Sequence, residues 1–250
     1  MKDTVAVILA AGESKRMNSN VSKLLHHLGG KLLVEFPVQA CIEANVGRII
    51  VVVGHQADKL KETLKDKGCE FVYQEKRLGT GDALRRATPL LQGFNGELVV
   101  LPGDAPFISA SLLKKLVIYH RKRKSTATIL TSIVPEPGYY GRVVRNGYKL
   151  VKKIVESKNA TPHQLKIKEI NSGIYCFDAG KIILALPSLK VNRLSGEVYL
   201  TDIFEIFYRQ KEKVEALPVD EPYLCMGVNT PDDWKKACEF FRNSGLFLSV

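Results

Sequence analysis

The sequence lacks the features that mark several classes of protein. No apolar run approaches the length of a membrane span, and the first residues show no secretory signal with a charged segment followed by an apolar one. The five cysteines are scattered, none of them at the spacing of metal ligands, and their odd number argues against a disulfide framework. The sequence shows no linker, internal repeat or low-complexity segment. These absences predict a cytoplasmic protein with reduced, buried thiols and no contact with a membrane.

Common catalytic and nucleotide-binding motifs are missing too. No Gly-Lys-Ser/Thr follows Gly12, which excludes a Walker A loop, and Ser14 stands where a G-x-G-x-x-G motif would have its second glycine. The five histidines form no cluster of ligands, and no Ser/His/Asp or Cys/His arrangement is evident. The sequence therefore offers neither a P-loop, a dinucleotide fingerprint nor a nucleophilic triad.

The most informative stretch that is present lies at the N-terminus. An apolar run from Val5 to Ala11 ends at Gly12, and a polar loop with Arg16 and Lys23 follows. The run is typical of a parallel strand buried on both faces, and ligands of open α/β sheets bind at the carboxyl edge of such strands. Small residues let a ligand approach the backbone amides, and the basic side chains add positive charge. The pattern predicts a cradle for a triphosphate, with an ordinary first strand and turn as the alternative.

The charge balance allows several kinds of partner. The 250 residues carry a net charge of +11, which fits binding of nucleic acid, a membrane surface or phosphorylated small molecules. The densest basic cluster, His120 to Lys124, ends a helical stretch, where cations complement the helix dipole. No aromatic residue interleaves with these charges. We therefore interpret the cluster as a solvated helix end and expect no nucleic acid partner.

Strand and helix signals alternate through the first half of the chain, about residues 1–110. This alternation predicts βαβ units and a parallel sheet. The expected strands are residues 5–11, 48–53, 69–74 and 98–101, and the expected helices are 33–45, 56–67, 81–91 and the stretch capped by Ser109.

The second half, about residues 111–250, has more antiparallel character. A β-rich stretch over 126–134 is followed by a hairpin of 141–145 and 149–155, with its turn at Asn146-Gly147. Further strands are expected at 169–177, 214–217 and 224–228, and helices at 179–186, 200–209 and after Thr230, an N-cap followed by proline. Without a linker between the halves, the sequence predicts a single α/β domain over residues 1–250.

Polar residues at the ends of these elements are candidates for a site. Asp104 leaves the fourth strand at the same sheet edge as the first loop, and Mg²⁺ favours one or two carboxylates plus substrate phosphates. Gln74, with the glycine turn at Gly79, can recognise the edge of a base. Glu156, Asn171 and Thr201 are of the kind that bind a neutral, hydroxylated ligand. Taken singly, Asp104 is as common in a turn as in a site, and each of the others is more common in a turn or on a surface than in a site.

Several short motifs stand in one order along the chain. Together they resemble the uridyltransferase domain of the bacterial bifunctional N-acetylglucosamine-1-phosphate uridyltransferase/glucosamine-1-phosphate acetyltransferase family, over roughly residues 4–235. The motifs are Leu9-Ala10-Ala11-Gly12 with Arg16-Met17 and Lys23, Gln74 with Leu78-Gly79-Thr80-Gly81, Gly103-Asp104, Tyr140-Gly141-Arg142, Glu156 with Ala160-Thr161, Glu169-Ile170-Asn171-Ser172-Gly173, Glu197-Val198-Tyr199-Leu200-Thr201-Asp202 and Gly227-Val228-Asn229.

The resemblance implies a Rossmann-like nucleotidyltransferase fold, with a mostly parallel mixed sheet flanked by helices and an antiparallel acceptor-binding subregion. It implies transfer of UMP from UTP to N-acetylglucosamine 1-phosphate, with Mg²⁺ held by Asp104 and Asn229. The catalytic residues that take the phosphates would be Arg16 and Lys23. The nucleotide-binding residues would be Leu9, Ala10, Gly12, Gln74, Gly79, Thr80 and Gly103, and the sugar-phosphate-binding residues would be Gly141, Glu156, Asn171, Tyr199 and Thr201.

Departures from the family pattern keep alternatives open. Ser14 stands where the family usually has a second glycine. The pattern Leu9-Ala10-Ala11-Gly12 with Ser14, Arg16-Met17 and Lys23-Leu24-Leu25 resembles the molybdenum-cofactor cytidylyltransferase group more closely, and Pro102 and Tyr139 differ on the sugar side. One alternative is therefore a nucleotidyltransferase for another sugar 1-phosphate or a cofactor, and a second is a non-enzymatic basic binding protein. No hexapeptide repeats follow in this chain, so we expect no acetyltransferase activity from it. The oligomeric state stays open, as a monomer or a weak oligomer.

Overall fold

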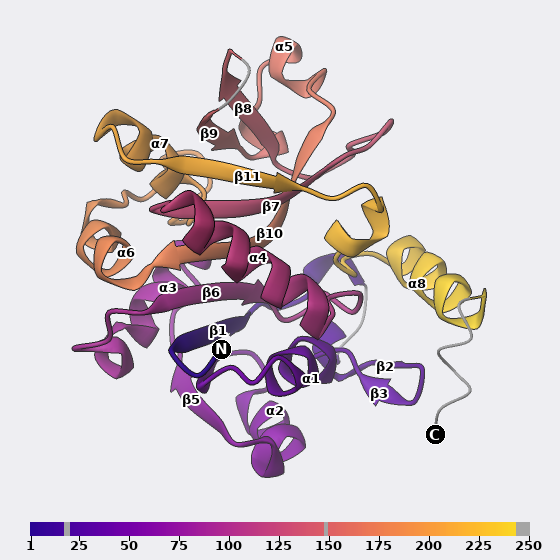
Figure 1. Cartoon of the computed structure of the whole chain (residues 1–250). Helices are drawn as coiled ribbons and strands as arrows, with labels where there is room; N and C mark the ends of the chain where they lie inside the picture. Colours follow the sequence, from indigo (N-terminus) through magenta and orange to yellow (C-terminus); the bar gives the residue numbers. More distant parts are fainter. Residues whose placement is uncertain (18–20, 148–149, 244–250) are drawn as a thin grey trace.

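The computed structural model describes residues 1–17, 21–147 and 150–243, and its centre is a mixed β-sheet (Figure 1). The first half of the chain supplies the parallel part, in the order β5-β4-β1-β6. These strands are β1 (Thr4–Ala10), β4 (Arg48–Val53), β5 (Cys69–Tyr73) and β6 (Glu97–Pro102). In β1, Val7 lies between Ile50 of β4 and Val100 of β6. The predicted parallel sheet of the first half is confirmed.

The second half extends the same sheet in the order β6-β10-β7-β11. Its strands are β7 (Ala127–Ile133), β10 (Glu169–Asp178) and β11 (Val214–Pro218). β10 runs antiparallel to both neighbours, and its Tyr175 lies between Val100 of β6 and Ile129 of β7. The hairpin of β8 (Arg142–Asn146) and β9 (Leu150–Val155) joins β10 through the pair Ile170 and Arg142. The predicted first residue of the second hairpin strand, Lys149, lies outside the described residues.

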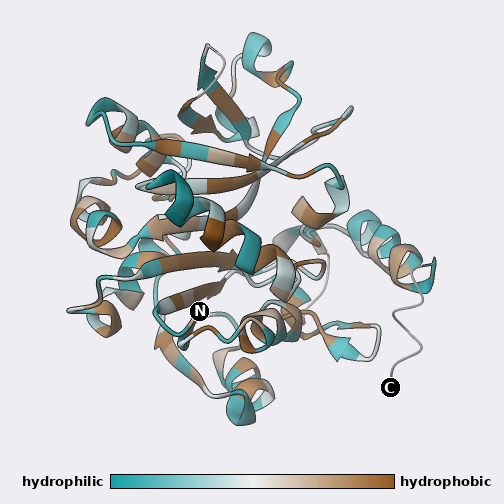
Figure 2. Cartoon of the chain, viewed as in Figure 1, coloured by the Kyte–Doolittle hydropathy of each residue, from teal (hydrophilic) through white to brown (hydrophobic). Residues whose placement is uncertain are grey.

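Helices cover both faces of the sheet because the strand side chains alternate between two apolar cores. In β1, Ile8 faces one core and Val7 the other. The first core is closed by α1 (Glu35–Glu43), α2 (Ala57–Leu64), α4 (Ala110–Arg123) and α8 (Pro231–Asn243), and the second by α3 (Thr80–Ala87), α6 (Ala179–Ala185) and α7 (Asp202–Arg209). Figure 2 shows the central strands β1 and β6 as largely hydrophobic. These layers confirm the predicted α/β fold class.

Two predicted helix starts carry the expected caps. The side chain of Ser109 accepts a hydrogen bond from the backbone N–H of Leu112, at 3.2 Å, and opens α4. Thr230 accepts one from the N–H of Asp233, at 3.1 Å, and opens α8. In both cases the hydroxyl satisfies a backbone donor that the helix itself leaves without an acceptor.

The strand predicted over 224–228 is wrong. Pro222–Cys225 forms a 3-10 helix, in which the N–H of Leu224 donates to the carbonyl of Glu221 at 3.1 Å. Cys225 and Val228 are buried because they pack into the first core beneath β7 and β10, not because they join a sheet. The apolar pattern was therefore a signal of burial, which a short helical turn satisfies as well as a strand.

Smaller differences occur elsewhere. The helix predicted over 81–91 ends at Ala87, and a 3-10 turn with Pro89 at its start, Thr88–Leu91, follows. A short hairpin of β2 (His27–Leu28) and β3 (Lys31–Leu32) and the helix α5 (Pro162–Leu165) were not predicted. The hairpin turns at Gly29 and Gly30, whose φ angles are 57° and 82°. Two glycines between short strands are a known signal for such a turn.

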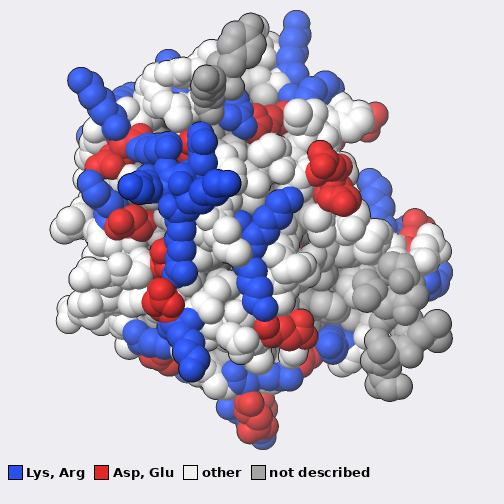
Figure 3. All heavy atoms as spheres, viewed as in Figure 1, with Lys and Arg blue, Asp and Glu red and all other residues white. Residues whose placement is uncertain are grey.

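Basic side chains gather over the C-terminal end of α4 (Figure 3), where Arg121 pairs with Glu97 and Asp3, and Arg123 pairs with Glu215. Carboxylates of the same chain thus neutralise part of the charge of this cluster, as expected of a solvated helix end. Within residues 1–17, 21–147 and 150–243, no helix combines the length and apolarity that crossing a membrane needs.

Candidate active site

A cavity of about 790 Å³ opens at the carboxyl ends of β1 and β6 and runs between the two halves of the chain. The predicted residues that line it are Leu9, Gly12, Arg16, Lys23, Gln74, Gly79, Thr80, Gly103, Asp104, Glu156, Asn171, Tyr199 and Thr201. The structure thus brings side chains from nearly the whole length of the sequence into one space. This placement is what the carboxyl edge of an open sheet predicts.

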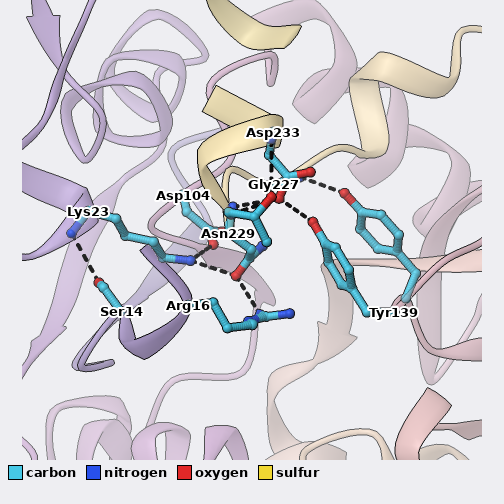
Figure 4. Close-up of polar contacts among 10 residues, drawn as sticks. Ser14, Arg16, Lys23, Asp104, Tyr139, Gly227, Asn229 and Asp233 are labelled. Carbon is cyan, nitrogen blue, oxygen red and sulfur yellow. Dashed lines mark hydrogen bonds and ion pairs between the residues drawn. The ribbon is translucent and has the colours of Figure 1, made fainter. Parts of the chain in front are cut away.

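A charged cluster, of which Arg16, Lys23 and Asp104 line the cavity, lies beside the first loop (Figure 4). The Lys23 ammonium contacts the carboxylate of Asp104 and donates a hydrogen bond of 2.7 Å to Oδ1 of Asn229. Arg16 donates to the same amide oxygen, at 2.8 Å. The side chains of Lys23 and Asp104 are only 13% and 12% exposed. Two cations and two oxygen-bearing side chains therefore meet here, with the Lys23–Asp104 pair largely shielded from solvent and Arg16 exposed.

The backbone around this cluster leaves no room for larger residues. Gly103 donates its N–H to the carbonyl of Leu9 at 3.0 Å, and a Cβ on Gly103 would lie 3.1 Å from that oxygen. A Cβ on Gly227 would lie 3.1 Å from Oδ1 of Asp104 and 3.2 Å from Nδ2 of Asn229. Glycine at these positions lets Asp104 approach both the first strand and the segment that carries Asn229.

The oxygen atoms of Asp104 and Asn229 fit a divalent cation. Both side chains direct an oxygen atom toward the ammonium of Lys23, which supplies the positive charge that these oxygens face. In the described part of the chain, no group of three or more His, Cys, Asp or Glu could hold a metal by itself. One carboxylate and one amide oxygen, completed by substrate phosphates, suit Mg²⁺ better than a metal that needs a full set of protein ligands.

The hydrogen bond of Ser14 explains why serine stands where the family usually has glycine. Its φ angle is +60°, a conformation that glycine adopts more easily. In return, its hydroxyl accepts a hydrogen bond of 3.0 Å from the backbone N–H of Lys23. The serine therefore fixes the backbone that carries Lys23, which a glycine could not do.

Gln74 and the start of α3 form one end of the cavity. The Gln74 amide nitrogen donates to Oδ2 of Asp82 at 2.7 Å and to the carbonyl of Gly79 at 3.2 Å. Both amide hydrogens are thus used, and the polar atom that remains for a ligand is an oxygen, which only accepts. Gly79 has φ +99°, and a Cβ there would lie 2.6 Å from the carbonyl of Val198.

Glu156, Asn171 and Thr201 form the other end. Thr201 donates its hydroxyl proton to Glu156 at 2.8 Å, and burial raises the pKa of this carboxyl above its ordinary value. Oδ1 of Asn171 accepts from the hydroxyl of Tyr175 at 3.1 Å. Tyr199 also lines the cavity, but its hydroxyl donates to Ser195 at 2.6 Å. Glu156 and Thr201 thus present acceptor oxygens, and Asn171, whose Oδ1 also accepts the N–H of Gly173, presents its amide donor; such a set suits the hydroxyl groups of a sugar.

Three predicted residues do not line the cavity. Ala10 is buried within β1, at 1% exposure. Gly141 lies behind Asn171, and a Cβ on it would be 3.4 Å from the Asn171 Cβ. Asn229 reaches the cavity only through its bonds to Lys23 and Arg16.

Sequence reasoning also missed residues that do line the cavity. They include the ion pairs Glu13–Arg77 and Lys158–Glu197, and Tyr139 as a contact of Arg16. The signal that could have indicated Tyr139 is its departure from the family pattern in the sequence. The ion pairs join residues far apart in the chain, so no local pattern could have indicated them.

Comparison with known proteins decides the family. Residues 6–154 match the family model of the MobA-like NTP transferase domain. The chain belongs to this family. It is therefore a nucleotidyltransferase, as its motifs predicted.

Relatives of longer length extend the likeness to both halves. The bifunctional protein GlmU of Geotalea uraniireducens is 40% identical over 252 residues, which cover 99% of this chain and 55% of that protein. GlmU of Acetivibrio thermocellus is 43% identical over 229 residues, with 92% and 50% covered. The chain spans about half the length of these curated relatives. These matches confirm the resemblance drawn from the motifs.

A solved structure, that of UDP-glucose pyrophosphorylase complexed with UDP-glucose, shares the fold. The TM-score is 0.77 at 19% sequence identity, and the match covers 96% of this chain and 99% of the other. This likeness agrees with the Rossmann-like nucleotidyltransferase fold that the motifs implied.

Proposed function

We propose that this nucleotidyltransferase transfers UMP from UTP to N-acetylglucosamine 1-phosphate and releases pyrophosphate. The observation that carries the proposal is that Arg16, Lys23 and Asp104, with Asn229 bonded to both cations, meet in one cavity between a base-binding end and an acceptor end. The GlmU relatives support it because they match across both ends. We further propose a cytoplasmic location with small-molecule substrates only.

In the proposed reaction, a phosphate oxygen of the sugar 1-phosphate attacks the α-phosphorus of UTP in line, and pyrophosphate leaves. The nucleophile is already an anion at neutral pH, so this chain supplies position and positive charge, not a general base. Arg16 and Lys23 would turn from Asp104 and Asn229 to the phosphate oxygens. Asp104 and Asn229 would hold Mg²⁺, which when bound neutralises charge between the two phosphates.

The base end favours uracil over cytosine. Because both amide hydrogens of Gln74 are used by Asp82 and Gly79, its oxygen is left to accept a hydrogen bond. Uracil presents a donor at N3, whereas the N3 of cytosine is an acceptor. This chemistry supports UTP as the donor substrate when the Gln74 oxygen meets N3, whereas cytosine could offer it a donor only through its 4-amino group.

Another acceptor is the second candidate, and Tyr139 favours it. This side chain lines the cavity at the position where many family members have glycine, so it changes the shape of the space for the acceptor. A different sugar 1-phosphate or a cofactor phosphate would then replace N-acetylglucosamine 1-phosphate. The metal and phosphate contacts would stay the same.

The first test is pyrophosphate release with Mg²⁺, with UTP, CTP, dTTP and GTP each combined with N-acetylglucosamine 1-phosphate, glucosamine 1-phosphate and glucose 1-phosphate. We expect one sharp maximum, at UTP with N-acetylglucosamine 1-phosphate, and its loss in EDTA. A maximum at another pair would identify that nucleotide and that sugar phosphate as the substrates instead. No turnover with any pair would contradict it.

Two variants test the roles within the cluster. Asp104→Ala and Lys23→Ala should each lower kcat by about 100-fold or more, because each removes charge that stabilises the transition state in a poorly solvated site. The exposed residues Asp220 and Lys190 provide matched controls, as Asp220→Ala and Lys190→Ala, and these should keep wild-type rates. Full activity in both cluster variants would show that the assignments are wrong.

A further inference from the structure

Tyr139 is tied to the segment that carries Asn229, although 94 residues separate it from Asp233. Its hydroxyl donates to Oδ2 of Asp233 (Figure 4). The same carboxylate oxygen accepts the backbone N–H groups of Asn229, at 3.0 Å, and Thr230, at 2.9 Å. Three donors therefore converge on one oxygen, and two of them fix the backbone at and beside Asn229.

The ring of Tyr139 makes a second contact at the same place. The guanidinium carbon of Arg16 lies 4.7 Å from the centroid of this ring, within the range of a cation–π contact. Arg16 in turn donates to the amide oxygen of Asn229 at 2.8 Å. The side chains of Arg16, Tyr139 and Asp233, together with the backbone N–H and side chain of Asn229, thus form a closed ring of contacts, which we call the Tyr139 clamp. Its members come from three segments of the chain: the loop after β1, the loop before β8 and the start of α8.

The neighbouring residue, Tyr140, supports the backbone that packs against Asp104. Tyr140 stacks on Tyr139, with centroids 4.9 Å apart and an interplanar angle of 23°. Its hydroxyl accepts the N–H of Gly227 at 3.3 Å, and Gly227 packs directly on Asp104 and Asn229. The stacked pair therefore connects the loop before β8, in the second half of the chain, to both side chains that fit Mg²⁺.

We propose that Tyr139 is a positioning residue that holds Asn229 through Asp233, so that its amide oxygen stays beside Asp104 as a ligand for a divalent cation. The inference rests on the proposed function in one respect, the role of Asp104 and Asn229 toward Mg²⁺. Burial and the bond to Asp233 raise the pKa of Tyr139, which therefore keeps the proton that it donates. Its ring additionally orients Arg16 for the phosphates.

The chain contains a probe for this region. Its single tryptophan, Trp234, follows Asp233 directly, and its ring meets that of His26 at 5.6 Å. Mn²⁺, which replaces Mg²⁺ at oxygen ligands, quenches the fluorescence of nearby tryptophan. A Mn²⁺ titration in the presence of UTP therefore measures cation affinity without turnover. Amide hydrogen exchange at Asn229 and Thr230 measures the clamp without any ligand.

The test compares the wild type with Tyr139→Phe, which removes the hydroxyl but keeps the ring over Arg16. We expect exchange at Asn229 and Thr230 to become about tenfold faster and the half-saturating Mn²⁺ concentration to rise about fivefold to tenfold, because a charge-assisted hydrogen bond is lost. Tyr139→Ala should in addition raise the KM for UTP. Tyr208→Phe is the matched control, since it loses a bond of 2.9 Å to Asn146 far from the clamp, and it should change neither readout.

Each other outcome decides between the two proposals. Unchanged exchange in Tyr139→Phe would overturn the clamp, and so would faster exchange with unchanged Mn²⁺ affinity, which would indicate a structural role only. Expected shifts in both readouts without turnover of any sugar phosphate by the wild type would support the clamp and contradict the proposed function alone. No Mn²⁺ binding by the wild type would overturn both. If Tyr139→Phe loses the native circular dichroism spectrum, Asp233→Asn tests the same contact.

Discussion

Glu156 shows how the surroundings of one residue can set the pH dependence of a binding site. The carboxyl group is partly buried beside the hydroxyl of Thr201, and burial raises its pKa above the ordinary value. The hydrogen bond from Thr201 and the charge of Lys158 act in the opposite direction but do not cancel the effect. Only the ionised carboxylate offers both oxygens as acceptors to the hydroxyl groups of a sugar.

We therefore predict that the KM for the sugar phosphate rises as the pH falls through the raised pKa of Glu156, while the KM for UTP changes little. Glu156→Gln should have a KM at high pH that is about tenfold larger and a weaker dependence on pH, because its amide is not ionised and only the substrate phosphate still titrates. The measurement is the KM of both substrates over the acidic pH range. A wild-type KM for the sugar phosphate that does not change with pH would contradict this role.

Asp82 sets the orientation of Gln74, the residue that we propose to recognise the base. Replacing Asp82 with Asn lets the Gln74 amide turn, because either of its ends then finds a partner. We predict that Asp82→Asn lowers the ratio of kcat/KM for UTP over CTP by roughly 10-fold to 100-fold, the effect of about one or two hydrogen bonds. The control is Asp58→Asn, in the first turn of α2 as Asp82 is in the first turn of α3. An unchanged ratio would show that Gln74 does not select the base.

At the scale of elements, the contact of α4 with β7 contains a buried histidine. His120 is 4% exposed and bonds Thr128 at 2.8 Å, and burial lowers its pKa to about 4. The unfolded chain binds this proton at higher pH than the folded one. The stabilisation is therefore complete above the ordinary pKa of 6.5 and is lost as the pH falls toward 4.

The free energy of unfolding should accordingly fall by roughly 3 kcal/mol between these two pH values through His120 alone. We predict that His120→Gln flattens this part of the pH profile, measured by urea unfolding at several pH values. The exposed His163 serves as the control, and His163→Gln should leave the slope unchanged. Equal slopes in the wild type and His120→Gln would contradict the prediction.

The elements themselves were predictable where apolar periodicity and breakers agree. The run from Val5 to Ala11 lies between parallel strands on both sides, and this burial is what its unbroken apolar pattern indicated. The segment from Leu224 to Val228 is as apolar, yet it forms a turn of 3-10 helix followed by a loop. Apolar residues record burial, and only the partners in the fold decide whether a buried segment is also a strand.

The site could be predicted where its residues lie in loops that follow strands whose carboxyl ends meet at one edge of the sheet. Asp104 and Lys23 could be placed together because both follow central strands. The contact of Tyr139 with Asp233 could not, since it depends on how the loop before β8 folds over the start of α8. Such contacts between distant loops leave no periodicity in the sequence.

For the molecule as a whole, the position of β10 determines how the two halves depend on each other. This strand lies between β6 of the first half and β7 of the second, so it is the strand that joins the two parts into one sheet. Trp234 of α8 also contacts His26 of the first half. The halves therefore share both core and sheet, in contrast to domains that meet at a small polar interface.

We predict that the chain unfolds in urea as one cooperative unit, with the same midpoint by far-ultraviolet circular dichroism and by the fluorescence of Trp234. Chains of this length often unfold in steps, so coincidence of the two probes is a demanding result. A chain truncated after Val155 keeps all of residues 6–154, which match the family, but it lacks β10 and β11 and so leaves β7 without either neighbour. This truncated chain should show no cooperative transition. Separate midpoints, or a truncated chain that unfolds cooperatively, would instead mean that the first half is an independent domain.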